Sequence, residues 1–411
     1  MLKTKKPSVF GGTMIIAGTA IGAGMLALPT VSAGMWIWWS FGIMIFVWLM
    51  MFLSSQALLE VNLNYNPGAS FHTLIYDNLG KFWNLVNGLS VAFVLYILIY
   101  AYVSGGGATI EYSIKEIMGV EISRPLAGFS FGIVLCLCVW WSTFLVDRIS
   151  VALLGGMVLT FIFTMSGMLG EMELSNFIVK DSENKGYVIF IWAALSTYLT
   201  SFCFHASVPS LVKYFGRDAK SVNKCLLYGT LIALCVYMVW IIACDGNISR
   251  ETFKEVIARG GNVDDLIVAA GSGLNSALLL RFLEIFAFLA VATSFLGAGL
   301  GLFDYIADLC GFDESRLGRT KTLLVSFAPP IIAGILYPNG FLYAIGWAGL
   351  AATLWSVIIP ALLLQASRKK NAQREFRVVG GSFVIYLLLV FGIVVGICHI
   401  LFVFNLLPLY K

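Results

Sequence analysis

A glycine-rich stretch lies inside the longest uncharged run of the chain. The run from Pro7 to Leu59 contains no Asp, Glu, Lys, Arg or His, and within it residues 18–29 read GTAIGAGMLALP. Backbone groups freed from a helix in lipid must find partners inside the protein or line a water-filled cavity. The stretch therefore predicts a broken membrane helix, whose bare backbone and half-helix ends could meet an ion or a zwitterion. The alternative is that the glycines only allow helices to pack closely.

A second stretch of this kind carries a histidine. Residues 200–209 read TSFCFHASVP, with small residues a few positions before Pro209. His205 could bind substrate or carry a proton, because imidazole changes charge near neutral pH and ionisable groups at membrane depth are commonly functional. The alternative is a buried histidine that only packs. Interrupted segments at corresponding positions of two repeats point to a binding site at the membrane midplane.

The composition places both stretches in a membrane protein. Of 411 residues, 59% are hydrophobic and 12% are charged, and the mean hydropathy is +0.90. A soluble domain carries about 25% charged residues. The net charge of +4 gives no reason to expect nucleic-acid binding, because the basic residues occupy short loops. Eight cysteines form neither a CxxC motif nor a metal-ligand spacing, so we expect no metal, cofactor or disulfide framework.

Eleven largely uncharged windows are long enough to cross a bilayer, which requires about 20 apolar residues. They are Val9–Pro29, Trp36–Leu59, Phe82–Ile110, Leu126–Val146, Ile149–Gly170, Tyr187–Val212, Cys225–Cys244, Ala277–Phe303, two within Thr322–Ser367 divided at residues 337–340, and Val378–Leu407. The two breaks then fall in the first and sixth spans. We predict an all-α membrane protein with one integral domain over residues 1–411. Its inverted repeats would cover residues 1–170 and 186–367, with an additional helix at 378–407.

The distribution of basic residues predicts the orientation. Most of the 26 lysines and arginines lie in segments on the same side of the membrane as the N-terminus, and such a bias marks the cytoplasmic side. With an odd number of spans, we expect a cytoplasmic N-terminus and a periplasmic C-terminus. The longest outer loop, Asp245–Ser276, is expected to contain a short helix capped by Ser249, which is either a lid or a surface helix.

Three segments resemble the bacterial tryptophan and tyrosine permeases of the hydroxy/aromatic amino acid permease family. They are Gly18–Pro29, Phe202–Ser210 and Thr293–Asp308, and the resemblance covers essentially the whole chain. Three further segments resemble the tryptophan branch more than the tyrosine branch: Asn87–Tyr96, Tyr228–Leu231 and Asn339–Gly346. The resemblance implies a LeuT-type 5+5 fold in the bacterial inner membrane. It also implies proton-driven import of an aromatic amino acid, tryptophan first, with tyrosine or a broader set as the alternative.

Within this resemblance, the substrate would lie between the two breaks. Backbone N–H groups near Ala23 and Gly24 would meet its carboxylate, and aromatic rings could stack on an indole at about 0.5–1.5 kcal/mol per pair. The predicted substrate-binding residues are Thr19, Gly22, Ala23, Gly24, Tyr96, Tyr100, Phe202, Phe204, His205 and Ser207. The expected partners are the substrate and the lipid bilayer, and the sequence does not predict an oligomeric state.

One departure from the family concerns the coupling ion. The family typically carries a lysine after Leu-Gly-x in the fifth span, in the place that a coupling cation occupies in related transporters; here Met157 follows residues 154–156. Another ionisable side chain within the membrane could bind the coupling proton. Alternatively, Na⁺ could bind hydroxyl groups and carbonyls of the first span. The candidates are His205, Glu60, Glu284, Thr293 and Ser294. Alternatively, Glu60 is an interfacial carboxylate and Glu284 only pairs with Arg281.

Two other classes of membrane protein are less well supported. A membrane-embedded enzyme would need a cluster of His, Asp or Glu or a nucleophile motif, and the sequence shows none. A channel would be expected to show charged rings or a carbonyl filter rather than broken helices at repeat-related positions. The sequence therefore favours a carrier over both.

Overall fold

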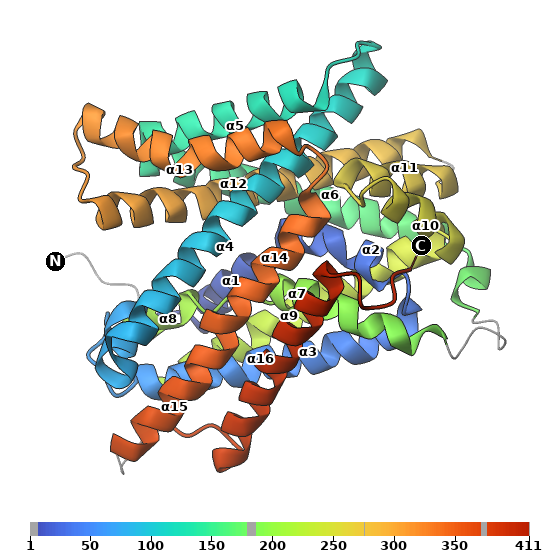
Figure 1. Cartoon of the computed structure of the whole chain (residues 1–411). Helices are drawn as coiled ribbons and strands as arrows, with labels where there is room; N and C mark the ends of the chain where they lie inside the picture. The colour runs from blue at the N-terminus through green and yellow to red at the C-terminus, as the bar shows by residue number, and fades with distance from the viewer. Residues whose placement is uncertain (1–6, 179–185, 275, 371–375, 411) are drawn as a thin grey trace.

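The computed structural model describes residues 7–178, 186–274, 276–370 and 376–410, and this part of the chain is helical with no strand (Figure 1). The α-helices are α1 (Val9–Ala20), α2 (Leu28–Ser32), α3 (Trp36–Asn62), α4 (Phe71–Met118), α5 (Arg124–Trp141), α6 (Thr143–Glu171), α7 (Ile191–Ser201), α8 (Ser207–Phe215), α9 (Ala219–Asn247), α10 (Arg250–Ala258), α11 (Val263–Gly273), α12 (Ala277–Cys310), α13 (Arg316–Leu336), α14 (Phe341–Thr353), α15 (Ile359–Lys370) and α16 (Gly381–Val403). Short 3₁₀ turns are η1 (Ala23–Ala27), η2 (Leu174–Phe177) and η4 (Val188–Phe190), and η5 (Leu354–Ile358) is a π-helical turn.

Among the described residues, eight helical segments are long and apolar enough to cross a membrane, and α1 with η1 and α2 would make a ninth. α3, for example, has 27 residues, about 40 Å at 1.5 Å per residue, against a hydrocarbon core of about 30 Å. The expectation of eleven spans is therefore met in part. The predicted span 187–212 consists of the short helices α7 and α8, and α13 is helical but does not qualify by length and composition.

The first break lies where the glycines predict it. α1 ends at Ala20, and η1 begins at Ala23. Between them Ile21 and Gly22 are extended, with φ/ψ of −76°/109° and −161°/−161°. The two halves of this segment are bent by 46°. Pro29 lies in the first turn of α2, where a missing N–H removes no helical hydrogen bond.

The second break also interrupts a helix. α7 ends at Ser201 and α8 begins at Ser207, so residues 202–206 belong to neither helix. Pro209 is the third residue of α8, where a backbone N–H has no intrahelical partner to lose. Gly216 then ends α8 in the left-handed conformation, with φ +59°. Both predicted breaks are thus present, each followed by a short helix.

Helix contacts recur between the two halves of the chain. α4 packs against α5 and α14, and α12 packs against α13 and α6. α1 packs against α9, and α7 packs against α3. If α4 and α12 are taken as the third segments of two five-segment halves, the named contacts correspond: α4–α5 to α12–α13, α4–α14 to α12–α6, and α1–α9 to α7–α3.

α10 and α11 lie at one end of the bundle, together with the C-terminus (Figure 1). The side chain of Ser249 accepts a hydrogen bond from the Thr252 N–H at 3.2 Å, which confirms the predicted cap of α10. α10 and α11 are joined through Gly260 and Gly261, whose φ values of +115° and +64° favour glycine. The predicted outer loop therefore contains two helices and a sharp glycine joint.

Arg250, the first residue of α10, holds several segments together. Its guanidinium donates to the carbonyl of Gly34 at 2.8 Å and to that of Ala33 at 3.3 Å, just beyond α2. The same group lies 4.1 Å from the ring centre of Tyr187 and 4.3 Å from that of Tyr410. Cation–π contacts of this kind are worth about 0.5–2 kcal/mol. α2, α10, the start of η4 and the segment after α16 are therefore tied at one point.

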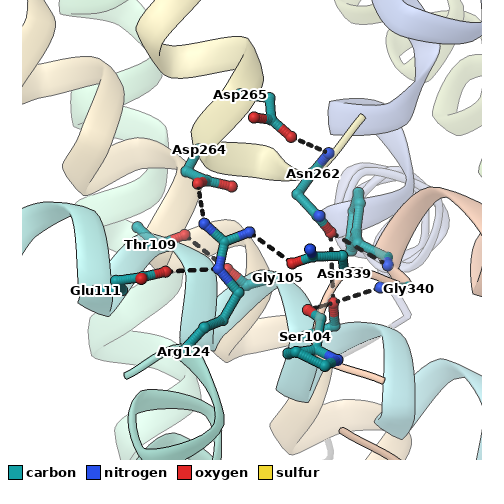
Figure 2. A network of polar contacts seen from close by, with 12 residues as sticks. Ser104, Gly105, Thr109, Glu111, Arg124, Asn262, Asp264, Asp265, Asn339 and Gly340 are labelled. Carbon is teal, nitrogen blue, oxygen red and sulfur yellow. Dashed lines mark hydrogen bonds and ion pairs between the residues drawn. The ribbon is translucent and has the colours of Figure 1, made fainter. Parts of the chain in front are cut away.

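A polar network fastens α11 to the rest of this end. Arg124 of α5 donates to Glu111 of α4 at 2.5 Å and to the Asn339 side chain at 2.8 Å, and it also pairs with Asp264 of α11 (Figure 2). Ser104 of α4 donates to the Pro338 carbonyl at 2.6 Å and accepts from the Gly340 N–H at 3.1 Å. The turn 337–340 between α13 and α14 is thus joined to α4, α5 and α11.

Candidate functional site

A cavity of about 490 Å³ lies at the first break. Residues 18–24 form one wall, and α4, α6, α7, α12, α14 and η5 contribute side chains to the others. Ligand pockets usually enclose about 300–1,000 Å³. The cavity therefore has the size of a site for a small molecule, at a place where regular helix structure is absent.

α9 supplies donors for the backbone carbonyls that the first break releases. The hydroxyl of Tyr237 lies 2.6 Å from the Ala20 carbonyl and 2.7 Å from that of Ser201, so it contacts both breaks. The indole of Trp240 donates to the Met25 carbonyl at 2.9 Å. Tyr237 and Trp240 are fully buried. The Trp240 N–H satisfies one carbonyl and the single Tyr237 hydroxyl proton serves either of two, so carbonyls that would otherwise be unpaired in an apolar interior have a donor within reach.

Ser294 of α12 fixes the other side of the break. Its hydroxyl oxygen accepts the Ala23 N–H at 2.9 Å. A Cβ atom added at Gly22 would lie 2.7 Å from the same oxygen, so a larger residue would displace the Ser294 hydroxyl from this position. A Cβ at Gly24 would make ordinary contacts of 3.5 Å with Ser201. Position 22 therefore has less room for a side chain than position 24.

Two backbone donors of this segment remain available. η1 begins with the bond from Met25 N–H to the Gly22 carbonyl at 3.1 Å, so the N–H groups of Ala23 and Gly24 precede its first internal bond. Ala23 donates to Ser294, whereas the N–H groups of Gly22 and Gly24 have no partner in the described part of the chain. Both residues line the cavity. Such a pair of donors at a half-helix N-terminus suits an anion.

Two aromatic side chains that were not among the predicted site residues also line the cavity. Tyr102 of α4 lies beside Ser294, and Trp355 lies in the π-helical turn η5. The Trp355 indole N–H has no hydrogen-bond partner among the described residues. π-Turns within helices are frequent at functional sites, but nothing in the local sequence marks this one. Tyr102 lies only two residues from the predicted Tyr100, on another face of α4, and of the two only Tyr102 lines this cavity.

The structure divides the predicted residues into two groups. Those that line the cavity are Thr19, Gly22, Ala23, Gly24, Thr293 and Ser294. Those that do not are Tyr96, Tyr100, Phe202, Phe204, His205 and Ser207. The Ser207 hydroxyl is nevertheless 3.2 Å from that of Thr19, and this contact joins the two breaks. Substrate binding by either group stays a prediction.

Tyr96 and Tyr100 point to a different hollow, between α4, α13 and α14, of about 1,060 Å³. Pro329 has no N–H to donate to the Val325 carbonyl one turn earlier, and the Tyr96 hydroxyl donates to that carbonyl at 2.9 Å. The Tyr100 hydroxyl donates to the Tyr337 carbonyl at 2.9 Å, at the end of α13. Both hydroxyls therefore stabilise a proline-containing helix.

The second break places its large side chains in the core. Phe202 and Phe204 are at most 1% exposed, and Phe202 packs edge-to-face on Tyr237 with ring centres 5.0 Å apart. His205 is fully buried and stacks on Phe204 at 4.9 Å. Neither ring nitrogen of His205 has a hydrogen-bond partner among the described residues. His205 meets the cavity only indirectly, 6.3 Å from the ring of Trp355.

The two candidate carboxylates are paired with arginines. Arg368 donates to both oxygens of the buried Glu60, at 2.9 and 2.8 Å. Arg281 donates to both oxygens of Glu284, at 3.1 and 2.8 Å, as the i, i+3 spacing predicts. Removing one partner of a buried pair typically costs about 3–5 kcal/mol. In this structure Glu60 and Glu284 each form an ion pair with an arginine, which is a structural role; a role in ion coupling stays a prediction.

Met157 of α6 lies beside the hydroxyls proposed for a cation. The Thr293 hydroxyl donates to the Leu289 carbonyl at 2.8 Å and lies 3.9 Å from the Met157 sulfur. A side chain at position 157 therefore reaches the α12 face that borders the first break. In the described residues, no group of three or more His, Cys, Asp or Glu could hold a metal ion.

Comparison with known proteins confirms the family resemblance. The model of the Tryptophan/tyrosine permease family matches residues 5–399. The chain is 49% identical over 405 residues to the Tryptophan-specific transport protein of Shigella flexneri, covering 98% of each chain. It is 41% identical over 408 residues to the Low affinity tryptophan permease of Escherichia coli (strain K12), covering 98% of each. It is also 39% identical over 415 residues to the Tyrosine permease of Enterobacter agglomerans, covering 100% of each. The chain therefore belongs to the tryptophan/tyrosine permease family, whose members are multi-pass membrane permeases rather than enzymes.

Proposed function

We propose that this protein is a secondary transporter that imports aromatic amino acids, tryptophan first, by proton symport. The observation that carries the proposal is the central cavity, which Tyr102 and Trp355 line together with Gly22 and Gly24, whose N–H groups have no partner among the described residues. In this cavity the backbone N–H groups of Gly22 and Gly24 suit a carboxylate, and the side chains of Tyr102 and Trp355 suit an aromatic ring. Relatives at 49% and 41% identity bear the name of tryptophan transport proteins or permeases, which supports this substrate.

In this proposal the substrate carboxylate accepts hydrogen bonds from Gly22 and Gly24 at the N-terminus of η1. The ammonium group meets carbonyls released in the two breaks. The indole ring contacts Tyr102 and Trp355, with about 0.5–1.5 kcal/mol per aromatic pair beyond the burial of area. Binding the two charged ends by backbone leaves the side chains to select the ring.

The recurring helix contacts support an inverted-repeat transporter of the LeuT type. Its eleven spans would include α7 with α8 as the broken sixth and α13 as the ninth. Such a protein works by rocking one bundle against another around a fixed site, so that the cavity opens to each side in turn.

Burial along the first span supports one particular state of that cycle. On the α2 side of the break, Met25 and Leu28 are fully buried. On the α1 side, Gly18 and Thr19 line the cavity and are exposed. The cavity is thus closed toward α2 and open toward α1. With a cytoplasmic N-terminus in the inner membrane, this is the inward-facing state.

We favour the proton as coupling ion because the chain belongs to a family that sequence analysis associates with proton-driven uptake. The second candidate is Na⁺, and the contact between Met157 and Thr293 is the observation in its favour. Without a lysine, the space beside the hydroxyls of Thr293 and Ser294 carries no fixed positive charge. Oxygen ligands from these hydroxyls and from first-span carbonyls would suit a hard cation.

Uptake of labelled tryptophan into proteoliposomes tests the proposal. A pH gradient without sodium should drive accumulation, and a sodium gradient at equal pH should not. Accumulation driven only by sodium would exclude the proton and favour the site near Met157. Competition with tyrosine and phenylalanine in the same vesicles should be weaker than with tryptophan. If tyrosine competes better, the tyrosine or broad aromatic alternative holds.

A further inference from the structure

One carboxylate lies deep among the helices without a charged partner. Asp245 is the third-last residue of α9, although sequence analysis assigned it to the outer loop. It is 0% exposed, and neither of its oxygens has a hydrogen-bond partner among the described residues. An isolated ionised carboxylate is very costly in such surroundings, and the group takes up a proton instead. The packed structure therefore requires Asp245 in its neutral form.

The groups around Asp245 come from the half-helices that follow or precede the breaks. Tyr198 of α7 is fully buried near Asp245, and its hydroxyl lies close to those of Ser32 of α2 and Ser40 of α3. The serine hydroxyls donate to carbonyls one turn earlier in their own helices, Ser32 to that of Leu28 at 2.6 Å. A buried polar cluster thus joins α2, α3, α7 and α9.

No charged side chain in the described part of the chain acts on this carboxyl. The titratable groups near it are Tyr198 of α7 and its own neighbour Cys244. The other candidates for a proton differ in this respect. Glu60 accepts two hydrogen bonds from Arg368 and Glu284 accepts two from Arg281, so each of these carboxylates has a charged partner. Asp245 is free to change its charge because no cation would be left unpaired.

We propose that Asp245 is the proton-binding group that couples the proton gradient to transport. The proposal rests on the proton symport proposed above and names its carrier. In each cycle the carboxylate takes one proton from water on the α2 side, becomes a neutral carboxylic acid, and later returns that proton to water on the other side. No other bond is formed or broken.

The cluster explains how this protonation would control the α2 side. Ionised Asp245 needs water, which enters the cluster when α2 and α7 separate from α3 and α9. The negative form therefore favours a structure that is open toward α2, and the neutral form allows the packed arrangement seen here. Ser201, three residues after Tyr198, lines the central cavity, so the proton can leave through that cavity once it is open toward α1.

Asp245→Asn tests this inference, because asparagine keeps the shape of the side chain and cannot carry the proton. Accumulation of labelled tryptophan driven by a pH gradient should be lost. Counterflow, the exchange of labelled for unlabelled tryptophan without a gradient, should continue at about the wild-type rate. Asp308→Asn, which changes an exposed carboxylate of α12, is the matched control and should keep both activities.

Other results of these measurements would overturn the assignment of Asp245 as the proton-binding group. Accumulation that persists in Asp245→Asn overturns the inference, as does loss of counterflow in a variant that remains monodisperse. If Asp245→Asn does not fold, Asp245→Glu should keep accumulation with a shifted pH profile, and an unchanged profile overturns the inference. Wild-type protein that shows counterflow but no accumulation under a pH gradient overturns the proposed proton symport itself.

Discussion

Tyr237→Phe removes a buried hydroxyl that contacts both breaks. This hydroxyl lies 2.6 Å from the Ala20 carbonyl and 2.7 Å from the Ser201 carbonyl, in a fully buried site. Leaving a buried acceptor unpaired costs about 1–3 kcal/mol, and hydrogen bonds between membrane helices reach about 1.7 kcal/mol. We take about 1–2 kcal/mol for this site, which corresponds to about 5- to 30-fold in an equilibrium constant.

The expected result is weaker binding of tryptophan by that factor, because the ends of both half-helices lose their common anchor beside the cavity. Isothermal titration of purified protein measures the affinity, and thermal unfolding reports stability. Tyr305→Phe is the matched control, since its hydroxyl joins α12 to the Gly88 carbonyl of α4 at 3.0 Å. The control should lose stability but keep its affinity. Wild-type affinity in Tyr237→Phe would refute the view that this hydroxyl orders the site.

Three further predictions concern the cavity wall and the α11 end. Gly22→Val should abolish tryptophan binding, because its Cβ would fall 2.7 Å from a hydroxyl oxygen, whereas Gly18→Ala meets open space and should bind normally. Trp355→Leu should raise the KM for tryptophan by about 2- to 12-fold, the equivalent of a stacking contact of about 0.5–1.5 kcal/mol; an unchanged KM would remove Trp355 from the site. Burial, together with a neighbouring aspartate, raises the pKa of Asp265 from 3.8 to about 6, so the folded protein binds more protons than the unfolded chain and its stability falls as pH rises through this range. Asp265→Asn should therefore raise the melting temperature above pH 6 and leave it unchanged below pH 3.8, and a gain at low pH alone would contradict this assignment.

The breaks could be predicted because their cause is local. Gly22 lacks the side chain that would contact the Ser294 hydroxyl of α12, and Pro29 and Pro209 lie in the first turns of short helices, where proline is favoured. Each of these backbone constraints depends on the residue type at one position and on its neighbours in the sequence. The hydroxyl cap of Ser249 is local in the same way.

The faces of the long helices could not be predicted with the same success. Tyr100 and Tyr102 differ by two residues, about 200° around a helix of 3.6 residues per turn, and the part of α4 around them, residues 82–110, carries no charged side chain that would mark one face. Only the packed structure shows that Tyr102 lines the cavity. It also shows that the Tyr96 hydroxyl donates to the Val325 carbonyl, which lacks its helical partner because Pro329 has no N–H. The π-turn that carries Trp355 likewise has no local signature.

Buried polar groups were hardest to anticipate from sequence. Asp245 follows an apolar run and precedes Gly246 and Asn247, which is the pattern of a loop, yet α9 continues to Asn247. Its burial depends on α2, α3 and α7, which are distant in the chain. His205 shows the converse, because its place in the break suggested contact with substrate and the packing around Phe204 encloses it.

The loop that carries α10 and α11 is fastened at both of its ends to different parts of the molecule. Arg250 ties α10 to the carbonyls beyond α2, and Asp264 ties α11 to Arg124 of α5. Gly260 and Gly261 form the joint between these anchors. The loop is thus a two-helix connection with a glycine hinge between its anchors. A relative movement of α2 and α5 would bend the connection at Gly260 and Gly261. If the proposed transport cycle moves α2 relative to α5, the length and stiffness of this loop act on the rate of that movement, although no residue of the loop lines the central cavity in the described part of the chain.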